Sequence, residues 1–335
     1  MLRFCNLARC PPQRDNREPS RVTLGRDQLV AAITDFLANQ DPSALAAMRS
    51  AVVSEIDSTP NTAIVALARR LATAGEDWRY YESDPVARRL HHVLADHILK
   101  PGSALEGVDH VKSVAGKPTV IFANHLSYAD ANLVEVLLHR AGGDDLALRL
   151  TVIAGPKVYS SLKRRFSSLC FATIKTPQSS GVASEDAIMN PREVVRAARQ
   201  SIDIAQERLR EGDALLVFAE GTRSRNKGLQ QMLSAVSRYL DADGTWILPV
   251  GIIGTDELFP VGDDTLHPVQ AIARVAAPID AARLRGLCGG DRRLIMDVVG
   301  LAIAGLLPDD YKGVYAPDAE GLDEARRVLE AVHAS

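Results

Sequence analysis

Six short apolar runs, separated by segments of helical spacing, occupy the chain from about Val111 onward. Each run is apolar at nearly every position, which predicts a strand covered on both faces, because a strand with one solvated face alternates apolar and polar residues. Alternation of such strands with helices indicates an α/β fold, an αβα sandwich on a mostly parallel, mixed sheet. The runs are TVIFA (119–123), LTVIAG (150–155), LCFATI (169–174), ALLVFAE (214–220), WILPVGI (246–252) and AIARVA (271–276).

The first hundred residues carry apolar side chains at helical spacing. Asp, Ser or Asn precedes several of these segments, in the place of an N-cap. Four helices with short polar joints predict a small bundle or cap. We therefore expect a helical domain over 1–104 and an α/β domain over 105–335, which a length of 335 residues allows. The four segments are DQLVAAITDFLA, SALAAMRSAVVSEI, NTAIVALARRLATA and DPVARRLHHVLADHIL.

Composition and charge argue against several classes of protein. The net charge is −3 and aromatic residues make up 5%, so a surface for nucleic acid is not expected. No window reaches the roughly 18 continuous apolar residues of a membrane span, and MDVVGLAIAGLLP (296–308) is shorter and interrupted by glycines. The first twenty residues lack an apolar core segment, so no secretory signal is expected. We expect a cytoplasmic protein that can lie on the inner face of the membrane.

The cysteines give no sign of a metal site. Cys5 and Cys10 stand in CNLARC, a spacing that fits no common zinc pattern. Reduced thiols are the expectation for a cytoplasmic protein. We expect neither a metal nor a cofactor.

The stretch IFANHLSYAD (121–130) places an imidazole and a carboxylate where a buried strand ends and a helix begins. Functional groups gather at such ends in open α/β sheets. A turn after His125 would bring Asp130 back to the ring, fix its tautomer and stabilise the imidazolium. His91 and Asp96 have the same spacing inside one predicted helix, where five residues leave the side chains roughly 140° apart, so that pair cannot meet.

A second polar segment, FAEGTRSRNKG (218–228), also follows a buried strand. Arg223 and Arg225 stand two apart, and two guanidiniums can make forked bonds to a phosphate or a carboxylate. The alternative is a solvated basic loop. Lys175, after LCFATI, would add an ammonium to this group, and Pro249 interrupts an apolar strand, which suggests a bulge or an edge.

The order NHLSYAD, EGTRS and ILPVGI resembles that of the glycerolipid acyltransferases, the family of glycerol-3-phosphate and 1-acylglycerol-3-phosphate O-acyltransferases. The resemblance covers roughly residues 105 to 315. The helical segment before it is organised as in the soluble plastid-type glycerol-3-phosphate acyltransferases. Two departures are Ala219, where the family often has Pro, and Lys175, where its second motif usually ends in Arg.

The resemblance implies a role for each site residue. His125 would be the general base and Asp130 its orienting partner. Arg223, with Gly221 and Thr222 of the EGTR motif, would bind phosphate, and Glu220 would lie near the acceptor hydroxyl. The remaining matches are Arg225, which stands as the second arginine of the plastid-type pair, Lys175, which stands in for the arginine of the second motif, and Pro249, which would help place the acyl chain.

The activity implied is transfer of a fatty acyl group from acyl-CoA or acyl-carrier protein to a hydroxyl of glycerol 3-phosphate. Lysophosphatidate is the alternative acceptor. No nucleophile elbow is apparent, so direct transfer is favoured over an acyl-enzyme, and Ser127 is a disfavoured nucleophile. A thioesterase or hydrolase using the same His–Asp pair, and a non-catalytic lipid-phosphate binding protein, are more distant alternatives. A nucleotide-binding domain lacks its glycine motifs.

The segment KVYSSLKRRFSSL (157–169) is basic and partly apolar. Lys163, Arg164 and Arg165 beside Leu162 and Phe166 predict a surface helix that contacts anionic lipid or the acidic donor carrier. An ordinary solvated helix face is the alternative.

Overall fold

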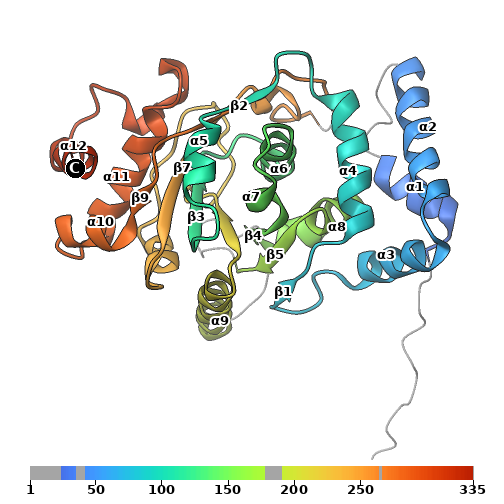
Figure 1. The fold of residues 1–335 in the computed structure, drawn as a ribbon, viewed down its shortest axis with the longest axis horizontal. Helices are drawn as coiled ribbons and strands as arrows, with labels where there is room; N and C mark the ends of the chain where they lie inside the picture. The colour runs from blue at the N-terminus through green and yellow to red at the C-terminus, as the bar shows by residue number, and fades with distance from the viewer. Residues whose placement is uncertain (1–23, 35–41, 178–190, 264–265, 335) are drawn as a thin grey trace, which may run out of the picture.

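The computed structural model describes residues 24–34, 42–177, 191–263 and 266–334. Within these residues nine strands form one sheet, and its strand order is β1-β5-β4-β6-β3-β7-β8-β2, with β9 paired to β7 (Figure 1). The predicted α/β class is confirmed, and all six apolar runs contribute strands. The strands are β1 (Tyr80–Tyr81), β2 (Ala104–Glu106), β3 (Thr119–Ala123), β4 (Leu150–Ala154), β5 (Ala172–Lys175), β6 (Ala214–Val217), β7 (Trp246–Ile253), β8 (Ile272–Val275) and β9 (Ile279–Asp280).

The five central strands, β3 to β7, run parallel to one another. The strands at the margins make the sheet mixed: β8 and β9 are antiparallel to β7, and β1 is antiparallel to β5. Because the central strands share a direction, β3 and β6 both end at the same edge of the sheet. The two predicted polar segments begin at that edge.

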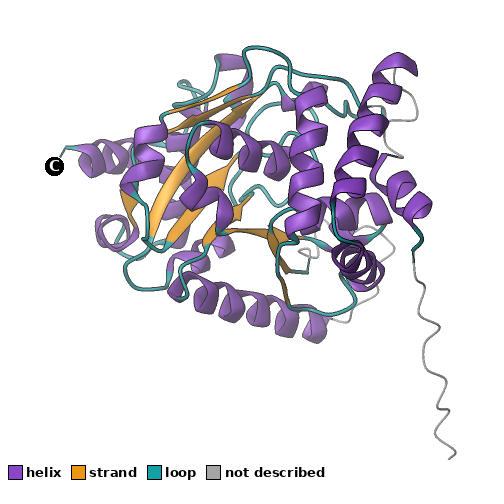
Figure 2. Ribbon diagram, turned by 45° about the vertical axis from the view of Figure 1, so that its right-hand side comes forward, coloured by secondary structure: helices purple, strands orange, loops and turns teal. Residues whose placement is uncertain are grey.

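Helices cover both faces of the sheet (Figures 1 and 2). Helix α9 contacts β5 and β6, and helix α11 contacts β3 and β7. Both also contact the short 3-10 helix at Ser234–Leu240. Helix α6 packs beside β2 and α4. The helices are α1 (Arg26–Thr34), α2 (Pro42–Ser58), α3 (Asn61–Thr73), α4 (Pro85–Ile98), α5 (Val108–Ser113), α6 (Asp130–Arg140), α7 (Asp144–Leu148), α8 (Leu162–Leu169), α9 (Pro191–Arg210), α10 (Ala281–Leu287), α11 (Arg292–Ala304) and α12 (Asp323–His333).

The first four helices are the four that helical spacing predicts. Helix α4 begins where Asp84 accepts hydrogen bonds from the backbone N–H of Val86 and Ala87, with Pro85 in the first turn. Helix α4 packs on α6 and α8, and α1 and α3 also pack on α8. The helical part therefore lies against the α/β part along α8 and α6. The division into two domains at residue 104 stays a prediction.

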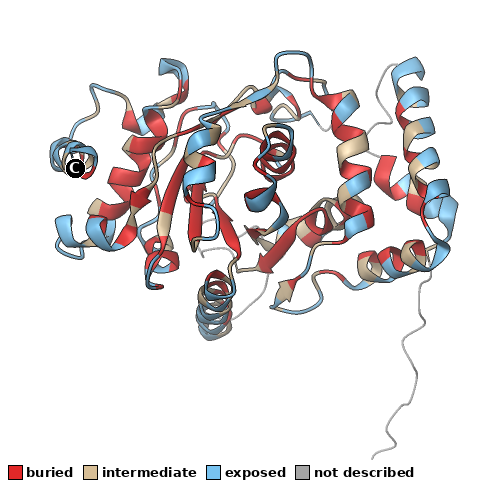
Figure 3. Cartoon of the chain, in the orientation of Figure 1, coloured by how far each residue is buried: buried red, intermediate tan, exposed pale blue. Residues whose placement is uncertain are grey.

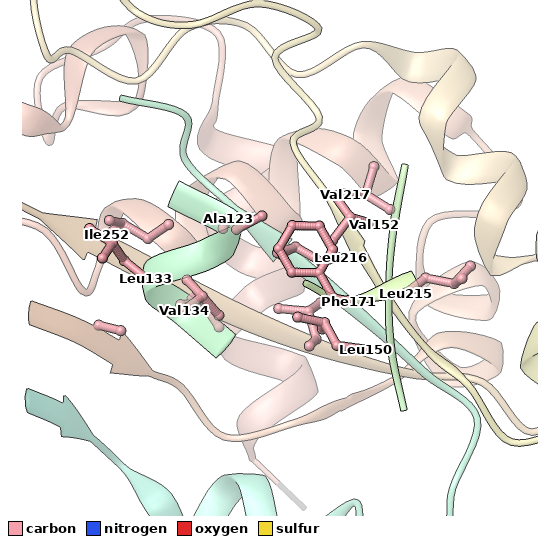
Figure 4. Close-up of a cluster of buried hydrophobic side chains, with 14 of the residues drawn as sticks. Ala123, Leu133, Val134, Leu150, Val152, Phe171, Leu215, Leu216, Val217 and Ile252 are labelled. Carbon is pink, nitrogen blue, oxygen red and sulfur yellow. The ribbon is translucent and has the colours of Figure 1, made fainter. Parts of the chain in front are cut away.

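Burial follows the predicted pattern: β3 and β6 are buried along their whole length, and β4, β5 and β7 at most of their positions (Figure 3). Figure 4 shows part of the core, where Leu133 and Val134 of α6 and side chains of the central strands, among them Leu216 and Ile252, belong to one buried apolar cluster. This core fixes the end of β3 relative to the start of α6.

Pro249 lies inside β7, which pairs with β3 on one side and with β8 and β9 on the other. The strand is therefore not an edge, but the predicted bulge is confirmed, because two residues of β7 (248–249) lie opposite three residues (276–278) between the β8 and β9 pairings. The Pro249 carbonyl accepts from the N–H of Ala276, beyond the end of β8, and the β9 pairing begins at Ile247. Since N–H and C=O of one residue point to the same side of a strand, the missing donor faces the interval between β8 and β9, where no ladder bond is lost.

Within the described residues, no helix has both the length and the apolarity to cross a bilayer. Cys5 and Cys10 lie outside those residues, and Cys170 and Cys288 are buried free thiols.

Candidate active site

The chain leaves β3 through Asn124, whose side chain fixes the strand end. Its amide donates to the carbonyl of Ile252 at 2.9 Å and accepts from the N–H of the same residue at 2.7 Å. This pair of bonds continues the β3–β7 contact beyond Ala123, where the ladder ends. The next residue, His125, therefore starts its turn from a rigid position.

His125 and Asp130 meet as predicted. The Nδ1 atom of His125 lies 2.9 Å from Oδ2 of Asp130, and the same oxygen accepts from the backbone N–H of Leu126 at 2.6 Å and of Ser127 at 2.8 Å. Asp130 is the first residue of α6 and is fully buried. A carboxylate oxygen only accepts hydrogen bonds, so Nδ1 carries the hydrogen, and Nε2 of the neutral ring keeps its lone pair.

The control pair inside α4 behaves as expected. His91 contacts the carbonyl of Asn132, and Asp96 pairs with Arg140. Helical geometry thus keeps His91 and Asp96 apart, whereas the turn after His125 brings Asp130 to the ring at the same sequence spacing.

The second oxygen of Asp130 has a partner that the sequence did not indicate. The hydroxyl of Thr255 donates to Oδ1 of Asp130 at 2.6 Å, and both residues have no exposed surface. The two lie 125 positions apart in the chain. No local motif links them, so sequence reasoning had no signal for this contact.

The ring of His125 lies on the ring of Phe218, with centroids 4.3 Å apart and the planes nearly parallel. Phe218 directly follows β6, so the stack joins the two strand ends that carry the polar segments. Both residues line a cavity of about 350 Å³, whose wall includes Val152, Phe171 and Ile202. A proton-accepting nitrogen thus stands beside a mostly apolar chamber.

Glu220 braces the turn that carries His125. Its Oε1 accepts from the backbone N–H of His125 at 2.7 Å, and its Oε2 accepts from the N–H of Gln230 at 2.8 Å. The N–H of Ser224 also donates to the His125 carbonyl, at 2.8 Å. Burial raises the pKa of Glu220 to about 7, although both backbone bonds oppose the rise. The predicted contact of Glu220 with an acceptor hydroxyl stays a prediction. Its hydrogen bonds to the backbone of His125 and Gln230 give it an additional, structural role.

Arg223 lines the same cavity as His125. Its guanidinium donates to the carbonyl of Phe259 at 2.9 Å and stands 4.7 Å from the ring centroid of Tyr128, a residue of the His125 turn. Arg164 stands over the same ring at 4.9 Å. Arg223 lines the His125 cavity and also a second, smaller cavity of about 180 Å³ beneath α4. The His125 segment and the Arg223 segment therefore line one cavity.

Gly221 and Thr222 line the His125 cavity beside Arg223. Gly221 has a φ of 74°, and a Cβ there would stand 2.6 Å from the side chain of Leu233. The EGTR segment thus needs glycine for its turn.

Two predicted cations do not line either cavity. The Lys175 ammonium donates to the carbonyl of Gly75 at 2.6 Å and lies 4.4 Å from the ring centroid of Trp78. The expectation that Lys175 adds its charge to the two arginines is therefore wrong in this structure, because its side chain points toward the N-terminal part. Arg225 lies exposed on the turn after Ser224. Its proposed phosphate contact stays a prediction.

The basic segment at α8 is only partly a surface. Arg165 donates to the carbonyls of Leu71 and Ala72 at the end of α3, so it joins the helical part to α8. Lys163 and Arg164 line the second cavity. These two half-exposed residues thus lie beside Arg223. The predicted contact of this helix with anionic lipid or the donor carrier stays a prediction.

Residues 104–253 match the model of a family described as Acyltransferase. The matched residues include the His125 turn, the Arg223 segment and Pro249. They form an acyltransferase-family domain, and over these residues the predicted family is confirmed.

A solved structure is similar at low identity: the 1-acyl-sn-glycerophosphate (LPA) acyltransferase PlsC from Thermotoga maritima. The similarity has 17% identity and a TM-score of 0.44, and it covers 77% of this chain and 86% of that chain. No curated protein matches the chain.

Proposed function

We propose that the protein transfers a fatty acyl group from a thioester donor, acyl-CoA or acyl-carrier protein, to a hydroxyl of glycerol 3-phosphate. His125 acts as general base in a direct transfer. One observation carries the proposal: His125, whose Nδ1 contacts Asp130, lines the same cavity as Arg223. The acyltransferase family of residues 104–253 supports the reaction class.

The reaction needs a proton removed from an alcohol while the new C–O bond forms. Nε2 of His125 takes the hydroxyl proton as the acceptor oxygen attacks the thioester carbonyl carbon. The tetrahedral intermediate then expels the thiolate, which recovers the proton from the imidazolium. Asp130 stabilises that imidazolium through Nδ1. General base catalysis of this kind contributes about 10²–10⁴-fold.

The acceptor must also be oriented, and Arg223 supplies the charge for its phosphate. Its guanidinium is held by Phe259 and Tyr128, so little side-chain freedom remains to be lost on binding. Such positioning contributes up to about 7–11 kcal/mol in well-aligned reactions.

Lysophosphatidate is the second candidate acceptor, and the cavity beneath α4 favours it. Its walls include Leu94, Ile98, Leu133 and Phe166, and Arg223 lies in its lining. An acceptor whose phosphate binds Arg223 would place its own chain against these apolar walls.

The test offers purified protein with labelled palmitoyl-CoA either glycerol 3-phosphate or lysophosphatidate, side by side. Formation of lysophosphatidate supports the first acceptor, and formation of phosphatidate supports the second. Rapid release of palmitate without acceptor would replace the proposal with a thioesterase. His125→Ala is the control for enzyme-dependent product.

A further inference from the structure

The segment GTDELFP (254–260) follows β7 and lies just beyond the residues that match the family model. Gly254 turns the chain with a φ of 85°, and a Cβ there would stand 2.3 Å from the carbonyl oxygen of Gln270. Glycine is therefore required at this turn. The next residue, Thr255, opens a short 3-10 turn that ends at Glu257.

This segment contacts both halves of the active site. Thr255 donates to Asp130, and the Phe259 carbonyl accepts from Arg223. Between them, Asp256 accepts from the hydroxyl of Tyr311 at 2.8 Å. The bond to Tyr311 therefore holds the segment in place independently of Asp130 and Arg223.

The bond to Thr255 completes the partners of the Asp130 carboxylate. Oδ2 faces His125 Nδ1 and two backbone N–H groups, while Oδ1 faces the Thr255 hydroxyl. A buried charge without a donor is costly, and partners on both oxygens also fix rotation of the carboxylate plane. The orientation of the Oδ2 contact with Nδ1 of His125 thus depends on the hydrogen bond that Thr255 donates to Oδ1.

We propose that Thr255 is a positioning residue for acyl transfer, which it supports by holding the Asp130 carboxylate in line with Nδ1 of His125. The inference rests on the proposed role of His125 as general base. Thr255 does not line either cavity and acts through Asp130. Its loss therefore lowers turnover without weakening substrate binding.

Three variants test this role. Thr255→Val keeps the shape and removes the hydroxyl, and Thr255→Ser keeps the hydroxyl. Thr151→Val is the matched control, because Thr151 is also fully buried and donates to a carboxylate, that of Asp213, at 2.5 Å, outside both cavities. Steady-state kinetics and thermal melting are measured for all three proteins.

We expect kcat of Thr255→Val to fall about tenfold, the rate equivalent of one lost hydrogen bond to a buried charge. KM for donor and acceptor stays unchanged, Thr255→Ser retains near wild-type kcat, and Thr151→Val changes melting only. In an Asp130→Asn background, Thr255→Val lowers kcat no further, because the charge that Thr255 orients is gone.

Wild-type kcat in a folded Thr255→Val protein overturns the inference, as does a fall that Ser does not restore, that also raises KM, or that adds fully to Asp130→Asn. If the valine protein does not fold, Thr255→Ala and Thr255→Ser are compared in the same way. If both Thr255→Val and Thr255→Ala fail to fold while Thr151→Val folds, Thr255 is structural and the inference fails. Retained activity in His125→Ala would instead end the proposed function.

Discussion

His125–Asp130 and His139–Asp144 are two pairs with the same spacing, and in both the Nδ1 atom contacts a carboxylate oxygen. Their surroundings differ. The side chain of Asp130 has no exposed surface and that of His125 has 17%, whereas His139 and Asp144 expose 45% and 52%. Asp130 accepts from four donors, while only the His139 contact is seen for Asp144 among the described residues.

The comparison shows that two His–Asp pairs with the same spacing and the same contact can differ widely in burial and in the number of hydrogen bonds that the carboxylate accepts. A pair in solvent gains little from its charge, because water screens it and both side chains lose freedom. Burial of Asp130 makes its charge effective on the imidazole, since the low-dielectric surroundings strengthen the interaction. One face of the His125 ring packs on Phe218, and the ring borders a cavity.

The largest expected effect separates the two histidines. His125→Ala should lower acyl transfer by about 10²–10⁴-fold, because the group that accepts the hydroxyl proton is lost. His139→Ala should leave the rate near wild type, since its contacts are at the surface. Product formation with labelled donor measures both. Comparable losses in the two folded variants would remove the distinction between the pairs.

The two aspartates should differ next. Asp130→Asn keeps the shape but removes the charge that stabilises the imidazolium, so kcat should fall about tenfold to a hundredfold, the rate equivalent of a charge-assisted hydrogen bond. Asp144→Asn should not change kcat. Kinetics alongside circular dichroism check this, and an unchanged kcat in Asp130→Asn would assign the burial of Asp130 to folding alone.

A smaller effect is expected for the two arginines, Arg223 and Arg225. Arg223→Ala should raise the acceptor KM about tenfold, because a charged contact to phosphate is lost. Arg225→Ala should raise it less, since Arg225 lies exposed outside both cavities. Initial rates at varied acceptor concentration give both values. The reverse order would show that phosphate binds on the turn after Ser224.

The smallest effect concerns pH and stability. Burial raises the pKa of Glu220 from 4.5 to about 7, so the folded protein holds that proton more tightly, and the free energy of unfolding should fall as pH rises through this window. Burial lowers the pKa of His91 from 6.5 to about 4, which gives a rise in stability as pH rises between those values. Denaturant titrations from pH 4 to 8 on Glu220→Gln and His91→Asn check both signs. An unchanged pH slope in either variant would contradict the assignment.

Much of the fold could be predicted because its signals are local. Apolar runs without alternation indicated buried strands, and helical spacing found α1 to α4. Pro249 was interpreted as a bulge or an edge; the bulge is confirmed by the register of β8 and β9 on β7, and the edge is wrong, because β7 is a central strand. Which strands lie beside β7 depends on the order of the sheet, which periodicity does not encode.

The amino-acid sequence by itself determined the α/β class, the turn that joins His125 to Asp130 and the arginine segment at a strand end. Each depends on residues only a few positions apart, so its geometry follows from local backbone rules. Only the tertiary structure decided that Thr255 holds Asp130, that Glu220 braces the His125 turn and that Lys175 points away. These contacts join distant segments, and the packing of the sheet and its helices decides which distant side chains come within bonding distance.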